Sequence, residues 1–589
     1  MVFTPPRWVP KLEHDTIPDS IPVSHFMLDE KYGRSKLRGC KSPFVCGLSG
    51  TEYTALEVKQ RVDFLARGLA KDLDWSPNQG SEWDKVITIF AHNTLDSIPL
   101  SWAVHNLSGI SSPANSAYSV SELTYQMKSS GSKAIFTCIS MLETALKAAT
   151  SCGIPRKHVY ILGMVYDRQL GYMQGADIKT VDQLISEGAH LPSLEPLRWK
   201  KGQGAQQCAF LIYSSGTTGL PKGVMVSHMN VIANVLQLAA FEARERRPGL
   251  HKVVLGLLPQ SHIYGLVAVY HAGIYRGDSV VVVPKFEILV LANAIARFKI
   301  NVLFVVPPVI IQMINSKHML DKLDLSSVTE VFSGAAPLGA EIHQALLAQY
   351  PSWYIRQGYG MTETATVISA TSTRDIFPGS VGNLLPGVEA RIVSHVDGSD
   401  ITQCGVAGEL LLRSPSVTNL GYLNNDHDTL ETFGTEGDRW LRTGDEAMFL
   451  QSPNSDGNES EHLFIVDRIK ELIKVNGYQV PPAELEACLL KHPLISDAAV
   501  IPVPDITAGE VPKAFVVLAP HDRGQFFQTP SEVAEEIDEY VRREKAHYKW
   551  LKGGVEFVNV IPKSPSGKIL RRILRDAERA KERQQQARL

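Results

Sequence analysis

The sequence has no cysteine pair at metal-ligand spacing, no excess of charge of one sign and no long hydrophobic run. Seven cysteines are scattered over 589 residues, and none forms a CxxC motif. This pattern indicates free thiols in a reducing compartment and argues against a disulfide scaffold or a zinc site. Lysine and arginine number 59 against 62 acidic residues, and the resulting net charge of −3 excludes a chain-wide basic surface for nucleic acid.

The lack of a long hydrophobic run bears on location. The longest apolar stretches, such as residues 302–311, fall well short of the roughly 18 residues of a membrane span. The first residues are rich in proline and charge, unlike a secretory signal. We therefore predict a soluble intracellular protein, long enough to bury a large core and, on length alone, to form roughly four domains.

Short apolar runs bounded by turn residues alternate with helix-like stretches through most of the chain. This alternation predicts an α/β fold with parallel βαβ layers. Residues 1–48 show little periodicity, and we expect them to wrap the surface as an N-terminal extension. The predicted strands are residues 86–90, 134–138, 159–162, 209–215, 280–284, 302–307 and 328–334, and the predicted helices are 53–71, 229–241, 287–299 and 339–349.

The pattern changes near Pro378. Residues 378–450 hold short alternating runs that predict a small antiparallel β section, and the low-complexity residues 451–462 predict a hairpin loop. We place a domain boundary at Asp467, so that residues 49–466 form a large domain and 467–589 a small α+β domain. Within the small domain the pattern predicts helices at 483–492 and 531–550 and strands at 498–503, 514–519 and 555–562.

The strongest local signal is residues 211–223, LIYSSGTTGLPKG. Glycines let the backbone approach a phosphate, hydroxyl and N–H groups donate to its oxygens, and Lys222 supplies a positive charge. The segment differs from the G-x-x-x-x-G-K-[ST] loop because Lys222 follows Pro221. It predicts a phosphate-binding loop between a buried strand and the helix at 229–241.

The segment SSGTTGLPKG closely resembles the phosphate-loop motif of the adenylate-forming (AMP-binding) superfamily. That superfamily includes acyl-CoA synthetases, 4-coumarate–CoA ligases, beetle luciferases and peptide-synthetase adenylation domains. The resemblance spans about residues 50–575. Its other motifs occur in the expected order as QGYGMTE (357–363), RTGD (442–445), DRIKELIKVNGYQVPPAELE (467–486) and PKSPSGKILRR (562–572).

The resemblance implies a fold and a reaction. The fold is a large N-terminal domain of two βαβ-type subdomains with a small β-barrel-like section, followed by a small mobile C-terminal domain. The reaction is that of an AMP-forming acyl-CoA synthetase. A carboxylate attacks the α-phosphate of ATP to give acyl-AMP and pyrophosphate, and the thiol of coenzyme A then displaces AMP. The small domain is expected to rotate about Asp467 between the two steps.

The resemblance also implies the ATP contacts. Tyr359 would cover the adenine face and Thr362 would contact the α-phosphate. Glu363 would hold Mg²⁺, which prefers oxygen ligands, and Asp445 has two acceptor oxygens for the ribose diol. The matching residues are Ser214, Ser215, Gly216, Thr217, Thr218, Gly219, Lys222, Gly358, Tyr359, Gly360, Met361, Thr362, Glu363, Asp445 and Arg468.

Two further residues complete the implied catalytic set with Thr362 and Glu363. Lys568 would reach the carboxylate and α-phosphate oxygens during adenylation only. His262 would orient the carboxylate or guard the thiol tunnel. The residues that match the motif for thioester formation, with lysines suited to coenzyme A phosphates, are Lys470, Lys474, Gly477, Tyr478 and Gln479.

The acyl group stays open at this stage. The chain has Asn476 where 4-coumarate ligases commonly have lysine, and Thr364, Ala365 and Thr366 change the pocket rim. Aryl, fatty and branched hydroxy acids, in fungal secondary or fatty-acid metabolism, are therefore all candidates. The positions that match the acyl pocket are Ile263, Tyr264, Ala268, Ser333, Gly334, Ala335, Gly358, Thr366 and Val367.

The chain ends in Ala587-Arg588-Leu589, which fits the small–basic–leucine pattern of the peroxisomal address. We expect binding to the peroxisomal import receptor, and a cytoplasmic location otherwise. Three alternatives to the ligase are a luciferase-like oxygenase, a stand-alone amino-acid adenylating enzyme and an inactive binding homologue. The presence of Lys222, Glu363, Asp445 and Lys568 argues against the last.

Overall fold

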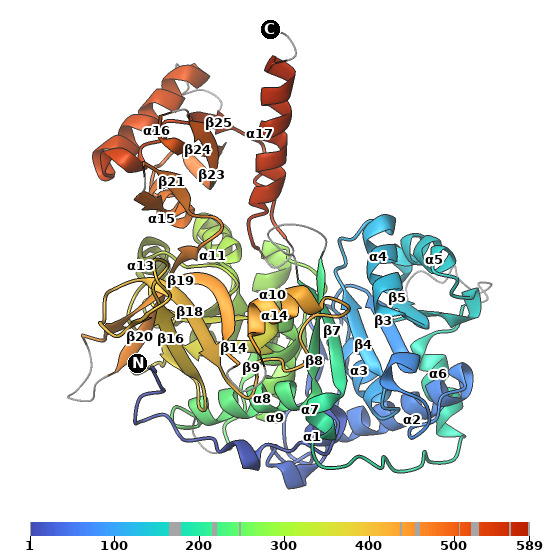
Figure 1. Cartoon of the computed structure of the whole chain (residues 1–589). Helices are drawn as coiled ribbons and strands as arrows, with labels where there is room; N and C mark the ends of the chain where they lie inside the picture. Colours follow the sequence, from blue (N-terminus) through green and yellow to red (C-terminus); the bar gives the residue numbers. More distant parts are fainter. Residues whose placement is uncertain are drawn as a thin grey trace.

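The computed structural model describes most of the chain as a large body with a smaller unit above it that carries the C-terminal helix (Figure 1). No helix in the described part of the chain is both long and apolar enough to cross a bilayer. The described residues are 2–163, 178–214, 221–246, 249–435, 439–453, 460–476, 478–505, 507–519, 529–564 and 567–586.

The first layer of the body is a six-stranded sheet in the order β6-β5-β3-β4-β7-β8. Adjacent strands in this sheet run parallel, except that β8 pairs antiparallel with β7. Its strands are β3 (Val86–Phe90), β4 (Ile110–Ala114), β5 (Ala134–Thr137), β6 (Val159–Ile161), β7 (Cys208–Ser214) and β8 (Lys222–Ser227). The helices nearby in the chain are α2 (Ala55–Leu73), α3 (Ser97–His105), α4 (Val120–Ser130), α5 (Leu142–Ser151), α6 (Val181–Ala189) and α7 (Gln203–Gln206).

The second layer is a nine-stranded sheet in the order β15-β14-β13-β12-β11-β9-β10-β1-β2. Its central strands are parallel and apolar on both faces, as expected for a sheet covered by helices. The strands are β1 (Phe44–Cys46), β2 (Glu52–Tyr53), β9 (Val253–Gly256), β10 (Ser279–Val282), β11 (Val302–Val305), β12 (Glu330–Ser333), β13 (Tyr354–Met361), β14 (Thr366–Ala370) and β15 (Asn383–Leu384). The helices are α8 (His228–Ala243), the π-helix η7 (Tyr264–His271), α9 (Ala272–Tyr275), α10 (Ile288–Phe298), α11 (Pro307–Asn315), α12 (Lys317–Leu320) and α13 (Ala340–Gln349).

The expected antiparallel β section is confirmed as a five-stranded sheet in the order β17-β16-β18-β19-β20. Its elements are β16 (Glu389–Val393), β17 (Asp400–Ile401), β18 (Gly408–Arg413), α14 (Asp426–Phe433), β19 (Leu441–Gln451) and β20 (Glu461–Arg468). Strands β19 and β20 form the expected hairpin, whose tip at 454–459 lies outside the described residues.

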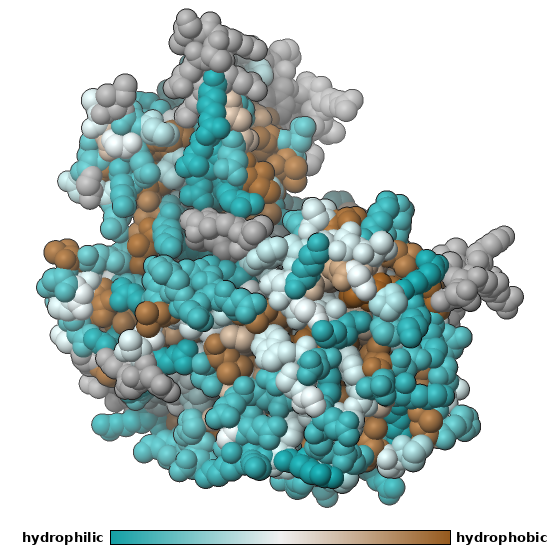
Figure 2. All heavy atoms as spheres, turned by 45° about the vertical axis from the view of Figure 1, so that its right-hand side comes forward, coloured by the Kyte–Doolittle hydropathy of each residue, from teal (hydrophilic) through white to brown (hydrophobic). Residues whose placement is uncertain are grey.

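The small domain has a hydrophobic core of its own, beginning at Ile473 and ending at Leu574. Its elements are β21 (Ile473–Val475), β22 (Tyr478–Val480), α15 (Pro482–Leu489), β23 (Ile495–Asp505), β24 (Gly509–Leu518), α16 (Pro530–Glu544), β25 (Val555–Phe557) and α17 (Arg571–Gln586). In the space-filling view the surface is mainly hydrophilic, and a notch separates part of the small domain from the body (Figure 2).

The strand and the helix expected on either side of the phosphate-loop segment are confirmed as β7 and α8, with β8 between the loop and α8. Two other expectations about local structure are wrong. Residues 1–48 do not simply wrap the surface, because α1 (Val23–Leu28) buries Phe26 and β1 buries Phe44 while pairing with β10. In the small domain, α16 ends at Glu544 and β25 ends at Phe557, both earlier than expected.

Candidate active site

Lys568 lies in a tight turn of the small domain that packs against the large body. The Ser564 N–H donates to the Lys568 carbonyl at 2.8 Å, and the Lys568 N–H donates to Ser564 Oγ at 3.2 Å. Gly567 has φ +81°, and a Cβ there would lie 2.9 Å from Val306 at the start of α11. A glycine is therefore required for the turn to approach the body this closely.

The charge of Lys568 faces groups from the β19–β20 hairpin. Burial and, after it, the charge of Arg468 lower the pKa of Lys568 to about 8, against the opposing charges of Glu471 and Asp445. Asp445 is 7% exposed, and burial raises the pKa of its carboxyl. Its Oδ1 lies 3.7 Å from Arg468 Nε, across the register of β19 and β20. The structure thus brings Lys568, Asp445 and Arg468 together.

The end of β13 adds Tyr359 and the following polar residues. Tyr359 Oη donates to Asp445 Oδ2 at 2.5 Å. A Cβ at Gly360 would lie 1.6 Å from the Thr366 carbonyl, so only glycine fits the sharp bulge between β13 and β14. The bulge turns the chain from Met361 into the short 3-10 helix η8 (Thr362–Thr364).

Thr362 and Glu363 are both buried in η8. The Glu363 carbonyl accepts a hydrogen bond from the Thr418 N–H at 2.8 Å, and Glu363 Oε1 accepts one from Tyr422 Oη at 2.9 Å. The Glu363 carboxylate therefore has a fixed direction, with one oxygen held by a phenol.

His262 comes to the same region from the segment before η7. Its Nδ1 accepts a hydrogen bond from the Tyr264 N–H at 3.2 Å. Burial lowers the pKa of His262 to about 4, with a further contribution from the charge of Lys568. The imidazole is therefore neutral near pH 7, and it is near enough to Lys568 for that charge to contribute to the lowered pKa.

The expected acyl-pocket residues form a closely packed wall. Tyr264 Oη donates to the Phe332 carbonyl at 3.0 Å, and the Tyr264 ring lies 3.0 Å from the position of a Cβ on Gly334. Ile263, Ala268 and Val367 are buried, and the buried Ser333 Oγ has no hydrogen-bond partner among the described residues. Ala335 and Thr366 have φ +68° and +116°, conformations that side chains rarely adopt and that occur at functional sites.

The phosphate end of the site is anchored by Lys222. Lys222 begins β8 and pairs in register with Ser214 at the end of β7. Its Nζ lies 2.6 Å from Asp428 Oδ2 and 5.0 Å from the centre of the Tyr422 ring. The expected loop residues Ser215, Gly216, Thr217, Thr218 and Gly219 lie outside the described residues.

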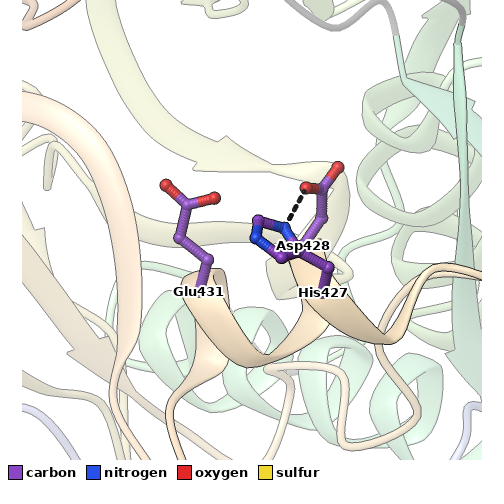
Figure 3. A group of neighbouring side chains, drawn as sticks. All are labelled: His427, Asp428 and Glu431. Atoms are coloured by element: carbon purple, nitrogen blue, oxygen red, sulfur yellow. Dashed lines mark hydrogen bonds and ion pairs between the residues drawn. The ribbon is translucent and has the colours of Figure 1, made fainter.

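Asp428 belongs to a polar group on α14 with His427 and Glu431, whose ligand atoms lie within 4.8 Å of one another (Figure 3). His427 Nδ1 is 3.2 Å from Asp428 Oδ1. Neither Tyr422 nor Asp428 was expected from the sequence. The helical pattern of residues 426–433 could have revealed α14, but no local pattern pairs Asp428 with Lys222.

The residues expected to serve coenzyme A differ from Lys568 in their exposure to solvent. Lys470, Lys474 and Gln479 are exposed, and Lys474 and Gln479 face each other across β21 and β22. Tyr478 is 57% exposed and stacks on Tyr548 at 4.5 Å. Gly477 lies outside the described residues.

The expected hinge residue links the two units. Asp467 accepts hydrogen bonds from the Arg468 N–H at 2.7 Å and from the Ala483 N–H, in the first turn of α15, at 3.0 Å. Burial raises the pKa of Asp467 to about 6. A second link between the two units is the ion pair at 2.8 Å between Lys491 of the small domain and Glu341 of α13, which no sequence pattern indicates.

Both parts of the chain match models of known protein families. The model of the AMP-binding enzyme family matches residues 36–423, and that of the AMP-binding enzyme C-terminal domain matches residues 484–568. Acyl-CoA ligase easD of Emericella nidulans is 40% identical over 579 residues, which cover 98% of this chain and 100% of that protein. Acyl-CoA ligase AFT1-1 of Alternaria alternata is 40% identical over 586 residues, covering 98% and 97%.

Solved structures share the fold. The anthranilate CoA ligase AuaEII in complex with anthranoyl-AMP matches with a TM-score of 0.80 at 22% identity, covering 97% of this chain and 100% of that one. The amide bond synthetase McbA of Marinactinospora thermotolerans matches with a TM-score of 0.73 at 25% identity, covering 93% and 97%. With both family models matched in order and relatives aligned over nearly its whole length, the chain belongs to the AMP-binding enzyme family.

Proposed function

We infer that this protein is an ATP-dependent acyl-CoA ligase that forms acyl-AMP and then an acyl-CoA thioester. The observation that carries the inference is that Lys568, in a turn packed against the large body, shares its electrostatic environment with His262 and Asp445 of that body and with Arg468 at the domain boundary. The relatives at 40% identity over nearly the full chain bear the name acyl-CoA ligase.

In the first half-reaction a carboxylate oxygen attacks the α-phosphorus of ATP, and the bond to pyrophosphate breaks. An anion approaches a polyanion, so the step needs positive charge at the oxygens where charge develops. Lys568 supplies that charge from the small domain. Asp445 accepts the ribose hydroxyls, for which its two oxygens keep free acceptor sites beside the hydrogen bond from Tyr359 Oη.

The donor chemistry of the site fits a magnesium ion. Glu363 is a buried carboxylate with Oε1 held by Tyr422, and its second oxygen is suited to Mg²⁺. When bound with ATP, Mg²⁺ neutralises charge on the departing pyrophosphate. The protein's own part is to fix the direction of Glu363 through η8 and Tyr422.

In the second half-reaction the coenzyme A sulfur attacks the acyl carbonyl and AMP departs. We assign Lys470, Lys474 and Gln479 to this step, with the lysines binding coenzyme A phosphates. They are exposed in this orientation of the small domain, so the assignment requires the domain to rotate about Asp467.

The substrate class that we propose is a carboxylic acid of fungal secondary or fatty-acid metabolism. The closely packed wall of Tyr264, Phe304 and Phe332 favours acids that fit beside an aromatic surface. Aryl, fatty and branched hydroxy acids are the groups to compare.

We also propose a peroxisomal location, supported by the terminal Ala587-Arg588-Leu589, which lies outside the described residues. A fluorescent tag on the N-terminus should give punctate cells, and deletion of Leu589 should make the signal diffuse. A diffuse signal from both constructs would reject the peroxisomal address.

The activity is tested by ATP–pyrophosphate exchange over about 30 acids of differing shape, followed by AMP and thioester formation with coenzyme A. An acyl-CoA ligase should exchange with at least one acid and form its thioester. Exchange without thioester formation would favour the amino-acid adenylating alternative, and light emission with a luciferin would favour the oxygenase. No exchange with any acid would contradict the proposal.

A further inference from the structure

The segment 421–428 is locked to the phosphate-loop hairpin by its backbone. The Met225 N–H donates to the Gly421 carbonyl at 3.0 Å, and the Leu423 N–H donates to the Gly223 carbonyl at 2.8 Å. Val224 and Tyr422 therefore pair as an antiparallel bridge. This register places Tyr422 and α14 directly beside Lys222, whatever occupies the site.

The carboxylate of Asp428 is itself held in place. Asn425 caps α14, with its Oδ1 accepting from the Asp428 N–H at 3.1 Å and its Nδ2 donating to Asp428 Oδ2 at 2.8 Å. The same Oδ2 receives Lys222 Nζ at 2.6 Å. The side chains of Lys222 and Asp428 are 35% and 24% exposed, so the pair is reachable by a ligand.

Lys222 Nζ thus lies between the Asp428 carboxylate and the ring of Tyr422. The Tyr422 Oη in turn donates a hydrogen bond to Glu363. The hydrogen bond from Lys222 lowers the pKa of Asp428 to about 2, so the carboxylate is ionised throughout the neutral range. The lysine of the phosphate loop is therefore neutralised by this chain's own acid when no nucleotide is bound.

We propose that Asp428 is a positioning residue that holds Lys222 in the nucleotide-free enzyme and competes with the triphosphate for it. The proposal rests on the proposed function, in which Lys222 binds ATP phosphates. Binding exchanges one anionic partner of Lys222 for another, while the Asp428 carboxylate keeps its hydrogen bond from Asn425 and is otherwise solvated. Asp428 sets the affinity for ATP and leaves the chemical step unchanged.

The test is calorimetric titration of MgATP into the full-length protein without acid. Asp428→Asn keeps the Asn425 contact but removes the charge, and its Kd for MgATP should fall about two- to fivefold, the range for loss of a partly exposed ion pair. Exchange kinetics should show the same fall in KM for ATP with kcat within about twofold, a split that separates binding from chemistry.

Two controls separate the pair from a general charge effect. Glu431→Gln removes a neighbouring carboxylate on α14 that has no described ion pair with Lys222, and its Kd should equal that of the wild type. In a Lys222→Met background, Asp428→Asn should change nothing, because the competitor has lost its partner. An unchanged or higher Kd in Asp428→Asn, or an equal fall in Glu431→Gln, would overturn the proposal. Wild-type protein that fails to bind MgATP would contradict the proposed function as well.

Discussion

The small domain carries two groups of lysines that differ in their exposure to solvent. Lys568 is partly buried against the large body, beside Asp445 and Arg468, and its pKa is lowered. Lys470 and Lys474 are exposed. In this orientation of the small domain Lys568 is partly buried, whereas Lys470 and Lys474 are open to solvent. The difference points to two orientations, one for each half-reaction.

The largest expected effect comes from removing the positively charged side chain of Lys568. Lys568→Ala should lower the rate of ATP–pyrophosphate exchange about 10²–10³-fold, the cost of losing one preorganised group at developing charge. The turn itself should persist, because its hydrogen bonds use the Lys568 backbone. Exchange at half the wild-type rate or more would show that Lys568 does not act in adenylation.

The lowered pKa of Lys568 predicts a pH dependence for the adenylation half-reaction, measured as pyrophosphate exchange. Lys568 is charged below its pKa of about 8, so kcat/KM for exchange should fall as the pH rises through 8, about tenfold for each further unit. Lys568→Arg stays charged over this range and should lose this alkaline limb, at a lower plateau. An alkaline limb that is unchanged in Lys568→Arg would belong to another group. His262, with a pKa of about 4, should not titrate in this range.

The exposed cations should affect the other substrate. The double variant Lys470→Ala, Lys474→Ala should raise KM for coenzyme A about three- to tenfold by removing charge-assisted phosphate contacts. Exchange should stay at the wild-type rate. Lys552→Ala, an exposed lysine elsewhere on the domain, is the matched control. An equal loss in the control would indicate a general effect of charge.

The smallest effect concerns the ion pair that joins the domains. Both Glu341 and Lys491 are 40% exposed, so reversing either charge should slow exchange about twofold, in line with a surface ion pair. The double reversal Glu341→Lys, Lys491→Glu should restore the rate. If the double variant is slower than both single variants, the pair does not hold the adenylation orientation.

Much of the fold follows from local patterns. The run of residues 86–90 becomes β3 with the expected bounds, because four apolar residues around the β-branched Thr88 suit a strand buried on both faces. The segment around Phe44 was misjudged because β1 is only three residues long and is stabilised by pairing with β10, more than 200 residues away. Such short strands leave no periodicity to detect.

The site residues also fall into two groups, those that local motifs predict and those that no local motif indicates. Motifs identified Lys222, Glu363, Asp445 and Lys568, since their residue types and spacing are local features. The partners Tyr422 of Glu363 and Asp428 of Lys222 have no such local signal, because each contact joins elements that are distant in the chain. The same holds for the ion pair between Glu341 and Lys491. The contact between Lys568 and the body depends on how two domains dock, which no local pattern encodes.

The central claim is that the two groups of cations serve different half-reactions, and one variant tests it most directly. Single-turnover thioester formation is measured for Lys568→Ala and for the wild type, with acyl-AMP and coenzyme A supplied and ATP absent. We predict that Lys568→Ala keeps at least about half of the wild-type rate here, because Lys568 stabilises charge only in the first transition state. A loss as large as that in pyrophosphate exchange would contradict the two-orientation account.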